Sequence, residues 1–261
     1  MRELEREDTP SPLSASPLAV IGRGRVGNSI AKAAEVAGID IRLSAHDAAI
    51  DGAGAVLLCV PDDAIAEVCE RVAKTRAPLV GHVSGASTLD VLASASERGA
   101  STFSLHPLQT FADGETAISG TPAAIAGSDE AALGYARSLA EALGMRPFEV
   151  PEEHRAAYHA AAAMASNLLV ALEESAAEIV ERLGIEDARE MLAPLVLRTA
   201  ANWAERGPAA LTGPIARGDR ATVQRHRVAL AETAPELVRL YDVLAMRAKA
   251  VAWESVHEVS S

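Results

Sequence analysis

Three histidines, His82, His106 and His159, combine the chemistry and the placement expected of proton donors. An imidazole changes charge near neutral pH, so it can give a proton to a carbonyl or imine that is being reduced. His82 and His106 each close an apolar run typical of a buried strand, and ligands of parallel sheets bind just beyond the carboxyl ends of strands. We predict that His106 is catalytic and that His82 and the following Gly85 contact the substrate, with Ser84 near the cofactor. The alternative for each lone loop histidine is a hydrogen-bonded turn residue.

His159 lies on a stretch with helical periodicity. At about 100° per residue, His159 and Asn167 fall about 80° apart on one side of a continuous helix, and Arg155 lies one turn before His159. We predict that His159 donates the proton and that Asn167 orients the substrate. The alternative is that His159 is a partly buried interface residue.

The segment 207–218 is rich in Gly and Pro and is too constrained for an ordinary link between helices. We predict that Thr212 and Arg217 bind the substrate. A guanidinium can hold a carboxylate through two hydrogen bonds, which suits Arg217 to an acidic substrate. The plainer alternative is that Arg217 pairs with Asp219 and that Asp219 caps the next helix.

Residues 22–27, with the sequence Gly-Arg-Gly-Arg-Val-Gly, follow a short apolar strand and open a helix. This context is typical of a Rossmann dinucleotide-binding turn, in which the glycines allow a tight turn, close approach of the pyrophosphate and close packing of the helix. The helix N-terminus adds N–H donors and a positive dipole. The alternative is a glycine-rich turn without a ligand. The predicted contacts of the dinucleotide here are Gly22, Gly24, Arg25, Val26 and Gly27.

The residue that reads the adenosine ribose is expected about 20 positions further on. That window contains Ser44 and His46 and has no carboxylate before Asp47. A hydroxyl with nearby cationic groups suits a 2′-phosphate, so we predict NADP in preference to NAD; the alternative is that Asp47 reaches the ribose. Val60 and Pro61, after the next strand, are predicted to pass close to the cofactor.

The elements that must position these residues change in type after Pro151. Up to residue 150, strands alternate with helices, which predicts a parallel sheet covered on both faces. The ten residues 45–54 are too few for a helix and a strand, so we expect a turn of helix and no proper strand there. The fold class is therefore α/β: a disordered leader at 1–16, a Rossmann-type dinucleotide-binding domain at 17–150, and an all-helical substrate and dimerisation domain at 151–261. The expected strands are 18–21, 39–43, 55–60, 78–83, 102–105, 122–126 and 146–150, and the helices are 25–37, 62–75, 87–98, 129–143, 152–183, 186–206, 219–232 and 235–256.

Composition narrows the class of partner. The formal net charge of −12 disfavours nucleic acid, which needs clustered Lys and Arg. No apolar run is long enough to span a membrane, and the N-terminal residues lack the apolar core of a signal peptide. Two cysteines without metal-type spacing predict no metal site and favour a reducing, cytoplasmic setting. Long helices with apolar stripes predict a homodimer.

Several motifs together resemble the proteins with a helical domain of unknown function called DUF2520. The resemblance places the chain near the 6-phosphogluconate dehydrogenase-like superfamily, with ketopantoate reductase and pyrroline-5-carboxylate reductase. It implies a nicotinamide cofactor and hydride transfer. β-Hydroxyacid dehydrogenases and ketopantoate reductases carry a Lys four residues before an Asn on the first inter-domain helix, whereas here Ala163 precedes Asn167. The matching motifs are Val60-Pro61-Asp62-Asp63, His82-Val83-Ser84-Gly85, the run from Leu105 to Phe111, Tyr158-His159-Ala160, Ala165-Ser166-Asn167 and the run from Leu211 to Asp219.

Two functions follow from these observations. The first is an NADP-dependent oxidoreductase that reduces a small carbonyl or imine acid, in the manner of ketopantoate reductase. The second is a dinucleotide-binding sensor or regulatory protein without turnover, which the missing Lys at position 163 favours. The two are separated by substituting His159 or His106, because only an enzyme would lose turnover while keeping its cofactor affinity.

Overall fold

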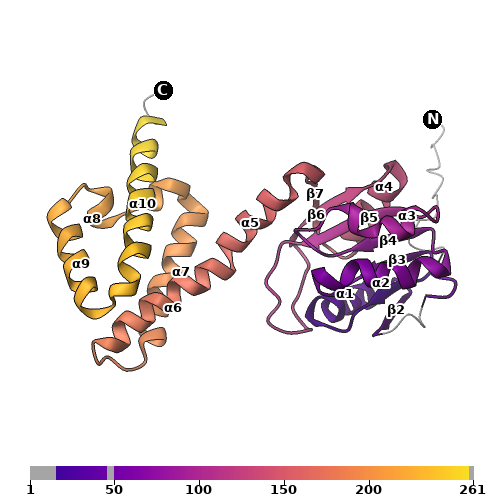
Figure 1. Cartoon of the computed structure of the whole chain (residues 1–261), viewed down its shortest axis with the longest axis horizontal. Helices are drawn as coiled ribbons and strands as arrows, with labels where there is room; N and C mark the ends of the chain where they lie inside the picture. The colour runs from indigo at the N-terminus through magenta and orange to yellow at the C-terminus, as the bar shows by residue number, and fades with distance from the viewer. Residues whose placement is uncertain (1–15, 46–49, 259–261) are drawn as a thin grey trace, which may run out of the picture. The chain divides into compact units, whose positions relative to one another are not determined.

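A computed structural model describes residues 16–45 and 50–258 (Figure 1). The predicted leader therefore lies almost entirely outside the described residues. The chain forms two compact units, one ending at Met164 and one beginning at Ala165, which we call the sheet unit and the helical unit. The division comes later than the predicted boundary after residue 150, because helix α5 (Arg155–Ala165) packs its first turns on the sheet.

The sheet unit contains seven strands in the order β2-β1-β3-β4-β5-β6-β7. Strands β1 to β5 are parallel, and β1 and β3 lie on opposite sides of the point where the strand order reverses. The predicted α/β class is confirmed. Among the described residues between β2 and β3 there is no further strand, while residues 46–49 lie outside the description. The strands are β1 Leu18–Ile21, β2 Ile41–Ser44, β3 Ala55–Leu58, β4 Leu79–His82, β5 Ser101–Pro107, β6 Pro122–Gly127 and β7 Arg146–Glu149.

Strand β6 departs from the predicted all-parallel sheet, because it runs antiparallel to β5. The connection from Leu108 to Thr121 holds no helix in the structure. A parallel neighbour needs a crossover, which is usually helical, whereas a chain that simply turns back pairs antiparallel. The helix-free loop after His106 is thus the physical reason for the reversal.

Helices cover both faces of the sheet, so successive residues of a strand enter opposite cores. Leu18 and Val20 of β1 pack with helices α1 and α4, whereas Ala19 and Ile21 pack with α2 and the short helix α3. The predicted helix at 87–98 is split into a 3-10 turn and α3. The helical elements of the sheet unit are α1 Arg25–Val36, η2 Asp62–Ala64, α2 Ile65–Val72, η3 Ala73–Thr75, η4 Leu89–Leu92, α3 Ala93–Ser96, α4 Glu130–Ala142, η5 Glu152–His154 and α5.

The helical unit consists of helices and 3-10 turns only. One predicted helix, 152–183, is interrupted at Ser166, whose φ of −130° and ψ of −84° are not helical. Arg227 of α9 and Asp242 of α10 form a two-bond ion pair that joins their helices, at 2.6 and 2.9 Å. No helix among the described residues is long and apolar enough to cross a bilayer. The elements are α6 Asn167–Arg182, α7 Ala188–Arg206, η6 Gly207–Ala210, α8 Gly213–Ala216, α9 Arg220–Thr233, η7 Pro235–Leu237 and α10 Val238–Glu258.

Candidate functional site

The turn between β1 and α1 has two positions at which only glycine fits. Gly22 has a φ of +117°, and a Cβ there would lie 2.2 Å from the carbonyl oxygen of Cys59. A Cβ on Gly27 would lie 1.9 Å from the Gly22 carbonyl oxygen. The Gly22 N–H donates to the carbonyl of Ser44 at 2.8 Å, which ties the turn to the end of β2. Gly22 and Gly27 are therefore required for the turn to form, because any larger residue would clash with the backbone there.

Gly24 differs, because nothing lies within 4 Å of the place where its Cβ would be. It occupies the N-cap of α1, which has no side-chain cap and no acidic residue in its first turn. The first N–H groups of a helix have no partner within it, so those of Arg25, Val26 and Gly27 remain for an external acceptor. Open space, free donors and the helix dipole together fit a phosphate group.

Arg25 is exposed beside this turn and donates from Nη1 to the carbonyl of Phe111 at 3.4 Å. Phe111 belongs to the helix-free loop that follows His106, so this loop lies against the start of α1. Ser44 ends β2, and Val60 and Pro61 follow β3, on the two sides of the point where the strand order reverses. His46, the other predicted contact of a 2′-phosphate, lies outside the described residues.

Four residues of the sheet unit meet at the carboxyl ends of β4 and β5, and we call them the histidine cluster: Gly85, His106, Tyr158 and His159. His106 Nδ1 lies 2.8 Å from the Tyr158 hydroxyl. The rings of His106 and His159 stand edge to face, with their centroids 5.8 Å apart. A Cβ on Gly85 would lie 2.5 Å from His159 Nδ1 and 2.8 Å from His106 Nε2. Both rings thus rest against the bare backbone of Gly85.

Burial sets the protonation of this cluster. The pKa of His106 is lowered to about 4, first by burial and then by the charges of His159 and Arg155, while Asp62 opposes the shift. Burial raises the pKa of Tyr158 to about 12. Both groups are therefore neutral at pH 7, and the Tyr158 hydroxyl can donate to His106 Nδ1. His159 Nδ1 is buried and has no hydrogen-bond partner among the described residues.

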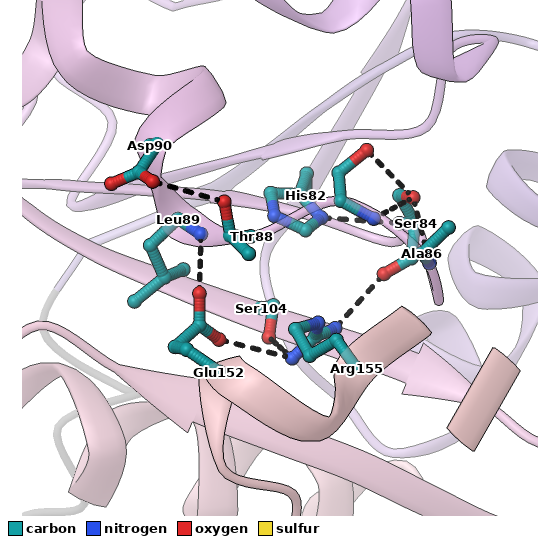
Figure 2. A network of polar contacts seen from close by, with 10 residues as sticks. His82, Ser84, Ala86, Thr88, Leu89, Asp90, Ser104, Glu152 and Arg155 are labelled. Atoms are coloured by element: carbon teal, nitrogen blue, oxygen red, sulfur yellow. Dashed lines mark hydrogen bonds and ion pairs between the residues drawn. The ribbon is translucent and has the colours of Figure 1, made fainter. Parts of the chain in front are cut away.

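His82 and Ser84 have structural roles that differ from the predicted ones (Figure 2). His82 is 0% exposed, and its Nδ1 accepts a hydrogen bond from the Ser84 N–H at 3.2 Å. The Ser84 hydroxyl accepts from the N–H groups of Ala86 and Ser87, at 3.2 and 3.0 Å. The side chain of His82 is thus held inside the sheet unit by its own turn, and its contact with the substrate stays a prediction. Ser84 is likewise 5% exposed and uses its polar atoms to hold the turn that presents Gly85.

The remaining predicted site residues, Asn167, Thr212 and Arg217, belong to the helical unit. The break at Ser166 removes the continuous helix from which the 80° relation of His159 to Asn167 was inferred. Thr212 is the N-cap of α8 without a side-chain cap bond, and Arg217 is exposed after that helix. Asp219 accepts the Thr222 N–H at 3.0 Å and so caps α9.

Two other features of the chain bear on ligands. Part of the segment from Pro214 to Asp219 lines a cavity of about 620 Å³ within the helical unit, together with residues of α9 and α10. Within residues 16–45 and 50–258, no group of three or more His, Cys, Asp or Glu could hold a metal ion.

Sequence reasoning missed Tyr158 and the contacts of Arg155. Tyr158 appeared only within a matching motif, and Arg155 was placed on the same side of the helix as His159 without a role of its own. Arg155 is 0% exposed, and it contacts Ser104 of β5 and Glu152 of η5. The available signal was a single arginine at the start of an alanine-rich helix, one turn before Tyr158 and His159.

Comparison with known families agrees with this architecture. Residues 39–107 match the family described as a Rossmann-like domain, and residues 121–248 match the domain of unknown function DUF2520. The chain combines a Rossmann-like domain with a DUF2520 domain. The second match begins in the sheet, at β6, and ends in α10. No curated protein matches the sequence significantly.

Solved structures share the fold of this Rossmann-like/DUF2520 chain. BF3122 from Bacteroides fragilis, whose proposed activity is that of an NADP oxidoreductase, has a TM-score of 0.75 at 22% identity and covers 92% of this chain and 100% of its own. TM1727 from Thermotoga maritima has a TM-score of 0.74 at 24% identity, covering 91% and 99%. The reductive aminase from Aspergillus terreus, in complex with NADPH and ethyl levulinate, has a TM-score of 0.63 at 17% identity, covering 90% and 94%. At these identities the likeness establishes the fold.

Proposed function

We propose that this protein is a nicotinamide-dinucleotide-dependent reductase of a small carbonyl or imine acid, with NADP as the preferred cofactor. The observation that carries the proposal is that one edge of one sheet holds both the glycine turn and the histidine cluster. Strands β1, β3, β4 and β5 are parallel, so their carboxyl ends meet at this edge. The names of the similar structures, an NADP oxidoreductase and a reductive aminase with NADPH, support the same class of reaction.

The residues present fit a dinucleotide. The open position at Gly24 and the free N–H groups of α1 suit the pyrophosphate, while Ser44 and Arg25 offer a hydroxyl and a cation for a 2′-phosphate. Val60 and Pro61 follow β3 at the same edge of the sheet. When bound, the cofactor supplies the hydride.

The histidine cluster supplies the proton in this proposal. Hydride addition to a carbonyl or a neutral imine leaves a negative charge on the oxygen or nitrogen, which a nearby donor neutralises by giving a proton. Nδ1 of His159 is buried, so Nε2 is the nitrogen left to face a substrate. Tyr158 holds His106 by its Nδ1, which leaves a proton on His106 Nε2, on the side of Gly85. Asn167 and Arg217 stay predictions for orienting the substrate and binding its carboxylate.

The first test is calorimetric titration of NADPH and NADH into the wild type and Gly24→Asp. We expect NADPH to bind at least about tenfold more tightly than NADH, since a 2′-phosphate adds charge-assisted hydrogen bonds. An aspartate at position 24 would put a carboxylate where the pyrophosphate lies, so binding should be lost. Absence of binding to the wild type would refute the proposal.

The second test separates an enzyme from a sensor. A panel of keto acids and cyclic imines is offered to the wild type with NADPH, and then to His159→Gln and His106→Gln. Both variants should lose turnover and keep the cofactor affinity. His154→Gln is the matched control, because His154 is exposed at the end of η5, directly before α5. Tight NADPH binding without turnover of any substrate in the panel would favour the sensor.

A further inference from the structure

The guanidinium of Arg155 is a buried charge with unusual neighbours. Its side chain is 0% exposed, and Nη1 donates to the Ser104 hydroxyl at 2.8 Å while Nη2 donates to the Ser84 carbonyl at 3.0 Å (Figure 2). Glu152 accepts from Nη1 at 3.5 Å, and Nε has no hydrogen-bond partner within the described part of the chain. Burying a cation with so little compensation is costly, so the residue calls for a role other than simple packing.

The contacts of Arg155 run beside the contacts of the histidine cluster. Tyr158 and His159 follow Arg155 by three and four residues, so they project from the same face of α5. On β5, Ser104 and His106 are two residues apart and share a face of the sheet. Arg155 therefore meets Ser104 where Tyr158, one turn later, meets His106.

At the end of β4, as on β5, Arg155 and the histidine cluster contact neighbouring residues. Arg155 donates to the carbonyl of Ser84, and His159 rests against the next residue, Gly85. One guanidinium thus joins α5 to two strand ends at once. Glu152 adds a third tie, because its Oε2 accepts the Leu89 N–H at 2.6 Å, on the connection that follows β4.

We propose that Arg155 is the positioning residue of this site, which brings the Tyr158 hydroxyl to His106 and the ring of His159 to Gly85. The effect of Arg155 on catalysis rests on the proposed reductase function, whereas its positioning of Tyr158 and His159 is independent of that function. Arg155 touches neither the substrate nor the cofactor, and it acts through the groups that it holds in place.

The charge of Arg155 gives the role a measurable signature. The titratable groups that interact with His106 are Tyr158, His82, His159, Arg155 and Asp62. Burial, then His159 and then the Arg155 charge lower the pKa of His106 to about 4, and the Asp62 carboxylate opposes them. A neutral His106 can accept the Tyr158 proton at Nδ1, whereas a protonated ring cannot. Losing the Arg155 charge should therefore raise the pKa of His106.

The experiment compares Arg155→Met, which removes the charge and the donors, with Arg155→Lys, which keeps the charge. The pKa of His106 is read from the NMR titration of ¹⁵N-histidine-labelled protein, with its resonance assigned through His106→Gln. We expect the pKa of His106 to rise in Arg155→Met and to change little in Arg155→Lys. Arg137→Met is the control, since Arg137 pairs with Glu149 on the surface of the sheet unit. A wild-type pKa in folded Arg155→Met would overturn the proposal.

If Arg155→Met does not fold, Arg155→Lys and Ser104→Ala are measured instead. Each variant weakens the hydrogen bond between Arg155 and Ser104, which joins α5 to β5. The Nδ1 resonance of His106 should then shift, because its hydrogen bond with the Tyr158 hydroxyl weakens. An unmoved resonance in both would overturn the proposal. NADPH affinity, measured on the same samples, should be unchanged. Because none of these readouts requires turnover, failure of the reductase function and failure of the positioning role are distinguishable.

Discussion

Replacing Gly85 by Ala places a methyl group between the two histidine rings. The new Cβ would lie 2.5 Å from His159 Nδ1 and 2.8 Å from His106 Nε2, whereas ordinary contacts begin at 3.4 Å. The His159 ring must therefore move by about 0.9 Å, and a displacement of about 1 Å in a reacting group can lower turnover by about 100-fold. Overpacking of this kind costs about 1–3 kcal/mol of folding free energy, which a stable domain can tolerate.

The assay follows NADPH oxidation with whichever keto acid or imine the wild type reduces, together with NADPH affinity and urea unfolding. We expect Gly85→Ala to lose about 100-fold in kcat and to keep its NADPH affinity, because the methyl group lies at the end of β4 and not at the glycine turn. Gly134→Ala is the matched control: nothing lies within 4 Å of its Cβ position on α4. It should be fully active and more stable by about 0.5 kcal/mol. Wild-type turnover in a folded Gly85→Ala would refute the assignment of the cluster.

Three further predictions concern the cofactor turn, pH and assembly. Gly24→Ala has room in the free protein but brings a methyl toward the pyrophosphate, so NADPH affinity in calorimetry should fall about tenfold or more at unchanged stability. Because the folded-state pKa values of His82 and His106 are both lowered to about 4, stability present above pH 6.5 should fall as the pH drops from 6.5 towards 4, with His82 contributing about 3 kcal/mol of the loss in urea titrations; His82→Asn should reduce that slope by about half. Leu197 and Trp203 on α7 are 71% and 65% exposed, and such apolar surface favours burial in a homodimer. Light scattering should therefore give about twice the 27.1 kDa chain mass, and Leu197→Glu should lower the measured mass; a monomeric wild type would contradict the predicted dimer.

The fold could be predicted because its signals are local. Apolar runs that end at glycines mark the buried strands, and the spacing of Gly22, Gly24 and Gly27 marks the turn into α1. The antiparallel β6 was missed although its cause was visible, since no helix was predicted between the strands at 102–105 and 122–126. A connection without a helix should have predicted a reversal of direction.

The site was harder to predict because it depends on contacts between distant segments. His106 and His159 were each selected by position, yet nothing in the sequence showed that their rings would meet over Gly85. Arg155 and Ser104 are 51 residues apart, and their hydrogen bond exists only once α5 is docked on the sheet. The inward turn of His82, whose Nδ1 accepts the Ser84 N–H, was likewise not visible in the sequence, because a histidine at a strand end can either face a ligand or hold the backbone.

The alanine at position 163 acquires a physical interpretation from this geometry. In the dehydrogenases that the chain resembles, a lysine precedes the helix asparagine by four residues, and here Ala163 stands at that place. His159 lies four residues before Ala163 on α5, one turn closer to the start of the helix and on the same face. In the proposed function, His159 takes the place of that lysine one turn earlier on α5. The buried Arg155, another turn back on that face, ties this part of α5 to the ends of β4 and β5, which fits the positioning role proposed for it.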